Sequence, residues 1–117
     1  MDFTEVIVAH VAWKQRLERY VGGDRTEALN VEQIGLDTRC ALGQWIYGEG
    51  ARFAACEEYL RVKEKHALFH KMAATIVQQC DSGDIAAARQ TLESDYSRIS
   101  EHVKRDLVRL ARRIAAD

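Results

Sequence analysis

The chain contains no proline, and its three cysteines, Cys40, Cys56 and Cys80, form no CxxC pair. Without proline, no helix in this chain is interrupted by a missing backbone donor. An odd number of unpaired cysteines is typical of a reducing compartment rather than of a secreted, disulfide-bonded protein. We therefore expect a cytoplasmic location.

Long hydrophobic runs and a dominant sign of charge are also missing. The apolar stretches are only a few residues long, and the first residues lack the basic region and apolar run of a signal peptide, so we expect no membrane span. The formal net charge is −1, from 17 basic and 18 acidic side chains, which argues against nucleic acid as a partner. With 117 residues, 47% of them hydrophobic, the chain suits one globular domain spanning residues 1–117.

Apolar residues recur at helical spacing in four segments, at about residues 2–21, 37–46, 57–80 and 84–114. Glycines gather at the corners between these segments, at Gly22, Gly23, Gly48, Gly50 and Gly83. The expected fold is all-α, an antiparallel four-helix bundle with a short extra helical segment.

Several boundaries can be predicted from capping residues. Asp37 is expected to cap the second helix, and Asp84 the last. A short helix is expected to begin at Asp24 or Thr26, and one further turn to form over residues 51–55. On the last helix the predicted inward stripe is Ile85, Ala88, Leu92, Ile99, Val103, Leu107, Leu110 and Ile114.

His66 and His70 carry the strongest local signal for a function. An i, i+4 pair on a helix places two imidazoles on one face, one turn apart, where both can bind one metal ion. The same spacing also arises by chance. His10 lies within the apolar stripe of the first helix, so its ring either finds a hydrogen-bond partner in the core or gives its lone pair to a metal.

Cys40 completes a candidate ligand set with these three histidines, although a free cysteine is often only a small buried hydrophobe. Three imidazoles and one thiolate form a closed tetrahedral set of the kind zinc prefers, with no place for an activated water. We therefore expect one zinc ion per chain, bound by His10, Cys40, His66 and His70, and no enzymatic activity. The helix N-terminus and the neighbouring Arg39 are expected to favour the Cys40 thiolate.

Other residues near these positions have simpler interpretations. Trp13, Asp37 and Trp45 are expected to pack near the metal. Gly43 is expected to permit a close approach or tight corner beside Cys40. His102, Cys56 and Cys80 do not share the ligand spacing, so we expect no metal role for them.

Three motifs resemble the chemoreceptor zinc-binding (CZB) domain family. They are His10-Val11-Ala12-Trp13-Lys14, then Arg39-Cys40-Ala41-Leu42-Gly43-Gln44-Trp45-Ile46-Tyr47-Gly48, then His66-Ala67-Leu68-Phe69-His70. In that family zinc is bound by a histidine of the first motif, the cysteine of CxLGxW and both histidines of HxxxH. These positions match His10, Cys40, His66 and His70.

The resemblance also implies a function and an assembly. It implies a homodimeric regulatory domain of bacterial chemoreceptors, diguanylate cyclases or other signalling proteins, with an output module in cis or in trans. Zinc, or hypochlorous acid through oxidation of Cys40, would then be the stimulus. Two alternatives remain open: a zinc-stabilised dimerisation module without a sensing role, and a haemerythrin-like iron and oxygen carrier, which needs more ligands than this chain supplies.

Overall fold

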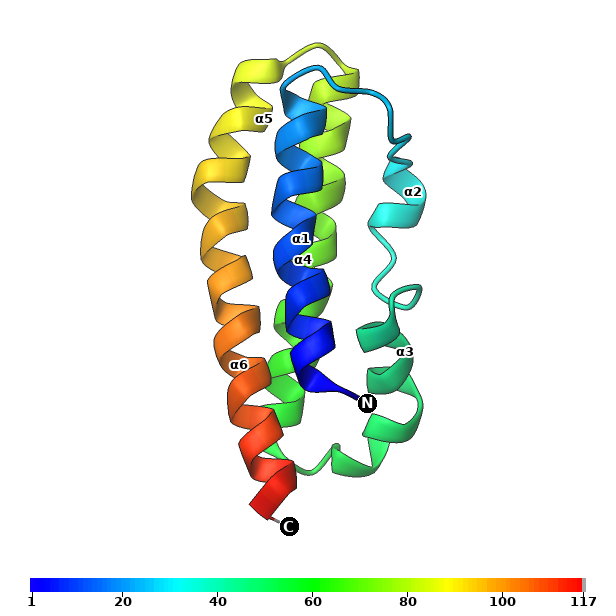
Figure 1. Cartoon of the computed structure of the whole chain (residues 1–117), viewed down its shortest axis with the longest axis vertical. Coiled ribbons are helices and arrows are strands. Elements are labelled where there is room, and N and C mark those ends of the chain that lie inside the picture. The colour runs from blue at the N-terminus through cyan, green and yellow to red at the C-terminus, as the bar shows by residue number, and fades with distance from the viewer. Residues whose placement is uncertain (117) are drawn as a thin grey trace.

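A computed structural model describes residues 1–116, and every regular element in that range is helical, so the all-α prediction is confirmed. The chain ascends along α1 (Phe3–Val21) and descends through the short helices α2 (Val31–Ile34), α3 (Ala41–Tyr47) and η1 (Glu49–Phe53). It ascends again along α4 (Glu57–Asp81) and returns through α5 (Ile85–Thr91), η2 (Leu92–Tyr96) and α6 (Ser97–Ala116) (Figure 1). The molecule measures 48 × 23 × 20 Å.

The first long helix begins and ends as its sequence predicts. The Asp2 carboxylate accepts hydrogen bonds from the backbone N–H groups of Thr4 and Glu5, at 2.9 and 3.2 Å, and so caps α1. The helix ends before Gly23, whose φ of 101° suits a residue without a side chain. Its buried residues are Val6, His10, Leu17, Tyr20 and Val21.

The segment between α1 and α4 differs from the prediction in two places. Thr26 donates its backbone N–H to the Asp24 carboxylate at 2.9 Å, a local turn that competes with a helix start, and the short helix begins instead at Val31. The helix that Asp37 was expected to cap is α3. It begins at Ala41, and its N-cap is Cys40. The predicted extra turn is present as a 3₁₀ helix, two residues earlier than expected.

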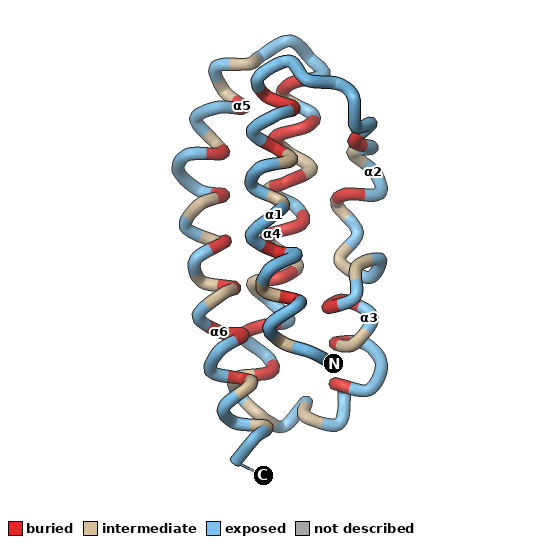
Figure 2. Tube along the Cα trace, viewed as in Figure 1, coloured by how far each residue is buried: buried red, intermediate tan, exposed pale blue. Residues whose placement is uncertain are grey.

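Helix α4 is the centre of the fold and packs against α1, α2, α3, α5 and α6. Figure 2 shows buried positions along the inner sides of the long helices. Tyr59 on α4 donates its hydroxyl to the carbonyl of Ile46 at 2.5 Å, which anchors the end of α3. None of the helices in residues 1–116 is long and apolar enough to cross a membrane.

The last predicted helix is continuous but contains a wide π-helical turn, η2, between α5 and α6. Asp84 caps α5 as predicted, by accepting from the Ala87 N–H at 3.0 Å. Because a π turn holds one residue more than an α turn, the inward stripe steps from Leu92 to Tyr96 to Ser100. The predicted stripe passed instead from Leu92 to Ile99 and missed both residues.

Candidate metal centre

Helix α4 presents His66 and His70 on its inner face, one turn apart. Both side chains are buried, at 2% and 4% relative exposure, and their ring centroids lie 4.5 Å apart. Their Nε2 atoms are separated by 3.0 Å. At this distance the two nitrogens can share one proton or bind one cation, so the pair is arranged to act together.

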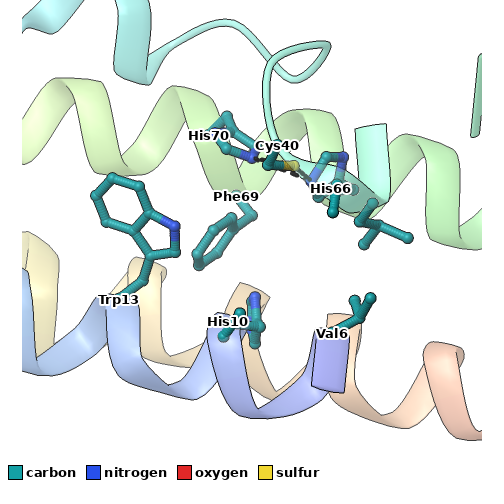
Figure 3. Close-up of a pocket in the computed structure, with 10 residues that line it drawn as sticks. Val6, His10, Trp13, Cys40, His66, Phe69 and His70 are labelled. Carbon is teal, nitrogen blue, oxygen red and sulfur yellow. Dashed lines mark hydrogen bonds between the residues drawn. The ribbon is translucent and has the colours of Figure 1, made fainter. Parts of the chain in front are cut away.

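Cys40 reaches the same point from the loop before α3 (Figure 3). As the N-cap residue it accepts the Gly43 N–H at its Sγ, at 3.3 Å. This contact directs the sulfur at α4, where Sγ lies 3.1 Å from Nε2 of His66 and 3.6 Å from Nε2 of His70. The capping position that sets the start of α3 therefore also places the thiol.

The three donor atoms fit one face of a tetrahedral metal site. All of them lie within 4.8 Å of one another. Zinc bonds of about 2.0 Å to nitrogen and about 2.3 Å to sulfur, at tetrahedral angles, would separate two nitrogens by about 3.3 Å and nitrogen from sulfur by about 3.5 Å. The observed separations of 3.0, 3.1 and 3.6 Å require only small adjustments.

The outer nitrogen of His70 has a defined partner. Nδ1 lies 2.8 Å from the carbonyl oxygen of Ile34, at the end of α2. Because a carbonyl only accepts, Nδ1 must donate the proton, and Nε2 keeps its lone pair for the centre. Nδ1 of His66, by contrast, is buried without a hydrogen-bond partner.

His10 is the predicted ligand that the structure does not bring into this cluster. It lies on α1, and its ring points into the space between α1 and α4 (Figure 3). It lines a cavity of about 60 Å³ together with Cys40, His66 and His70. Its Nε2, however, lies 3.0 Å from Oγ and 3.2 Å from the carbonyl oxygen of Ser100 on α6.

Burial keeps the histidines neutral. It lowers the pKa of His10 to about 4 and that of His66 to about 3, and it also lowers the pKa of His70. The hydrogen bond to Ser100 partly opposes the effect at His10, as the bond to Ile34 does at His70. Neutral imidazoles offer lone pairs at physiological pH, as metal ligation requires.

Burial has the opposite consequence for Cys40, whose pKa it raises. The N–H groups of Gly43 and Leu42 favour the thiolate but do not outweigh the loss of water around the sulfur. Arg39 is exposed. The prediction that the thiolate is favoured before any metal arrives is therefore wrong.

The three residues expected to pack nearby occupy different places. Trp13 lines the cavity, with its ring edge-on to His70 at a centroid distance of 6.5 Å. The Asp37 carboxylate accepts the Tyr47 hydroxyl at 2.5 Å and so braces the turn before Cys40 against α3. Trp45 packs in a separate aromatic group, with Phe3, Phe53 and Tyr59 at centroid distances of 5.6, 6.1 and 6.4 Å.

Gly43 permits the close approach that its position predicted. A Cβ atom there would overlap the carbonyl of Asp37, so any side chain would push the turn over residues 37–40 away from α3. We expect Gly43→Ala to lower the free energy of unfolding by about 1–3 kcal/mol, measured by urea denaturation. Gly35→Ala is the matched control, because its Cβ would make only ordinary contacts, at 3.5 Å with the Ala74 Cβ and the Val31 carbonyl oxygen and at 4.0 Å with the Glu32 carbonyl oxygen. Equal stability of the two variants would contradict this account of the turn.

The remaining cysteines and histidine lie outside the cluster. Cys56 is the N-cap of α4, and Cys80 is buried near the other end of that helix. His102 is half-buried on α6. No second group of three or more metal-binding side chains occurs within residues 1–116.

Two partners of the histidines were not predicted from the sequence. The Ile34 carbonyl carries no side-chain signal, and Ser100 stands 90 residues from His10. Ser100 could have been noticed only as a polar residue on an otherwise apolar helix face. Placing it on that face requires knowing that a π turn precedes it.

A comparison with protein families gives an independent result. The family model described as the chemoreceptor zinc-binding domain matches residues 10–77, more than half of the chain, and this range contains His10, Cys40, His66 and His70. No match was found among curated proteins or among solved structures. The chain belongs to the chemoreceptor zinc-binding domain family.

Proposed function

We propose that this chain is a cytoplasmic regulatory domain of bacterial signalling, in a chemotaxis or cyclic-di-GMP system, that binds one zinc ion through Cys40, His66, His70 and His10. The observation that carries the proposal is the convergence of Sγ and two Nε2 atoms from α4 and the α3 loop. The family membership of the chain supports zinc as the metal. Four protein ligands would leave no place for an activated water, so the proposed role is regulatory and not catalytic.

When bound, zinc supplies one centre that accepts these lone pairs and keeps the Cys40 sulfur deprotonated. The proposed ligands lie on two elements that differ in length and regularity. His66 and His70 lie on a 25-residue helix at the centre of the fold. Cys40 lies at the start of a seven-residue helix, after a turn without regular structure. A change at the sulfur therefore moves the α3 loop more readily than it moves α4.

Cys40 is also the proposed point of attack for an oxidant. It is half-buried and lines both the inner cavity and an outer groove of about 360 Å³, which it shares with Trp13, Arg39 and His70. Hypochlorous acid would transfer its oxygen to the thiolate, which gives a sulfenic acid and chloride. The oxidised sulfur then binds zinc more weakly, and the α3 loop is released from α4.

The oxidant test uses zinc-loaded protein and a chromophoric zinc chelator. We expect hypochlorous acid to release zinc from the wild type and from the Cys56→Ala/Cys80→Ala variant, in which Cys40 is the single remaining cysteine. Cys40→Ala, loaded at a higher zinc concentration, is expected to release no additional zinc on oxidation. Failure of the variant that retains only Cys40 to respond would refute the redox proposal while leaving zinc binding in place.

We also propose that the domain forms a homodimer and acts on an output module in cis or in trans. Exposed apolar residues on the outer side of α1 support this, since Val8 is 64% and Val11 is 45% exposed. Sedimentation equilibrium is expected to give twice the chain mass of 13.3 kDa. A monomer at all concentrations would refute the dimer.

A purely structural role for zinc is the second candidate function. Its support is that the three donors connect α4 to the loop before α3, a link that stabilises the fold without any sensing. Under this alternative, a chelator lowers thermal stability but leaves the attached or partner output unchanged. A haemerythrin-like di-iron site is not proposed, because the cluster in residues 1–116 contains no carboxylate.

A further inference from the structure

The contact between His10 and Ser100 connects the candidate centre to α6. Nε2 of His10 lies within hydrogen-bond distance of both oxygens of Ser100, Oγ at 3.0 Å and the carbonyl at 3.2 Å. Both side chains are buried, at 5% and 8% exposure. Two acceptors placed at one ring nitrogen in a dry environment fix the orientation of the imidazole.

This geometry also fixes which nitrogen carries the proton. A carbonyl oxygen only accepts, so Nε2 of His10 must be the N–H donor, and Nδ1 must hold the lone pair. Within residues 1–116, Nδ1 of His10 makes no hydrogen bond, and the ring lines the cavity that Cys40, His66 and His70 share. The nitrogen with the free lone pair therefore belongs to a ring that lines the same cavity as the three clustered donors.

We propose that Ser100 is the positioning residue of the centre: it holds the Nε2 proton of His10, so that His10 binds the metal through Nδ1 whereas His66 and His70 bind through Nε2. This inference rests on the proposed zinc function. Ser100 then accepts the N–H of His10 at the nitrogen that does not bind the metal, as the Ile34 carbonyl does for His70. Each outer partner belongs to a different helix, so the centre is connected to α2 and to α6.

The π turn gives this connection a structural origin. Ser100 faces inward because η2 widens the helix over Leu92–Tyr96, and Tyr96 and Ser100 follow at four-residue steps. An uninterrupted α-helix would turn Ser100 away from His10. The π turn therefore contributes to the candidate metal centre by orienting Ser100, although no residue of the turn belongs to the donor cluster.

Zinc affinity gives the first test, by competition with a chromophoric chelator. Ser100→Ala is expected to bind zinc about tenfold more weakly than the wild type, because the hydroxyl is lost and the carbonyl remains. Ser94→Ala, which removes an exposed hydroxyl in η2, is the control and is expected to match the wild type. In a His10→Ala background Ser100→Ala is expected to have no effect, because Ser100 acts through His10.

The direction of the change separates two roles for Ser100. If the metal had to draw Nε2 of His10 away from Ser100, the serine would be a competitor, and Ser100→Ala would bind zinc more tightly. Tighter binding, or binding equal to the wild type, overturns the proposal. Circular dichroism of Ser100→Ala, expected to be the same as that of the wild type, shows that the helices are retained.

Nitrogen-15 NMR of the histidine side chains gives a second readout that a merely structural serine would not alter. In the zinc-loaded protein we expect Nε2 of His10 to be protonated and Nδ1 to be metal-bound, with the opposite pattern at His66 and His70. A metal-bound Nε2 at His10 overturns the inference and leaves the zinc site intact. Wild-type protein that binds no zinc overturns the proposed function itself, so the two failures are distinguishable.

Discussion

Cys40→Ala is expected to weaken zinc binding by about 10²- to 10³-fold. A structural zinc site with four ligands contributes about 10–16 kcal/mol, so one ligand accounts for about 3–4 kcal/mol of it, or two to three powers of ten in affinity. The thiol is the single sulfur in the cluster, and no other cysteine within residues 1–116 lies close enough to replace it. Competition with a chromophoric chelator at pH 7.5 measures the effect.

Cys56→Ala is the matched control for this experiment. It removes a half-buried thiol at another helix N-cap, and it is expected to leave zinc affinity unchanged. Equal affinities for Cys40→Ala and the wild type would show that the sulfur is not a ligand. Equal losses in both cysteine variants would point to a general loss of folding instead of a specific role for Cys40.

Acid is expected to destabilise the zinc-free protein in a range where most small domains remain stable. The folded-state pKa values of about 4 for His10 and about 3 for His66 lie below the unfolded value of 6.5, so the unfolded chain binds more protons between these limits. The stability that these neutral imidazoles contribute is therefore fully present above pH 6.5, and it is lost as the pH falls toward their folded-state pKa values. Between pH 6.5 and 4.5 each of these two imidazoles costs about 2 kcal/mol, and His70 adds a loss in the same direction.

Urea denaturation at a series of pH values, with chelator present, measures this slope. His66→Gln is expected to flatten it, because one of the buried imidazoles is gone. A zinc-free protein whose stability is constant from pH 7 to pH 4.5 would contradict the burial of these rings.

The turn over residues 35–40 has a larger role than its sequence suggests. At one end the Ile34 carbonyl accepts the Nδ1 proton of His70, and at the other Cys40 provides the sulfur. Asp37 lies between them, where its carboxylate accepts the Tyr47 hydroxyl and its carbonyl packs against Gly43. This short segment therefore supplies one proposed ligand and the outer partner of another, so we expect it to respond to zinc occupancy more strongly than α4 does.

Local patterns in the sequence were sufficient to predict the long helices and three converging donors. The apolar stripes of α1 and α4 have helical periodicity, and the i, i+4 spacing of His66 and His70 fixes their shared face. The sequence predicts Cys40 as a ligand. It also predicts Asp37 as the N-cap of this helix, whereas the N-cap in the structure is Cys40. Short helices leave little periodicity, so their boundaries depend on capping contacts that compete closely with one another.

Long-range contacts account for what could not be predicted. The partner of His10 depends on how α6 rotates against α1, and that rotation depends on a π turn for which the sequence of residues 92–96 has no periodic signal. The Cys40 pKa was predicted in the wrong direction because the helix N-terminus and Arg39 are visible in the sequence, whereas burial of the sulfur is not.

X-ray absorption at the zinc edge of the zinc-loaded protein tests the central claim most directly. The account predicts one sulfur at about 2.3 Å and three imidazole nitrogens at about 2.0 Å around each zinc ion, with the sulfur contribution absent in Cys40→Ala. A wild-type spectrum without sulfur, or one with two sulfurs, would contradict it.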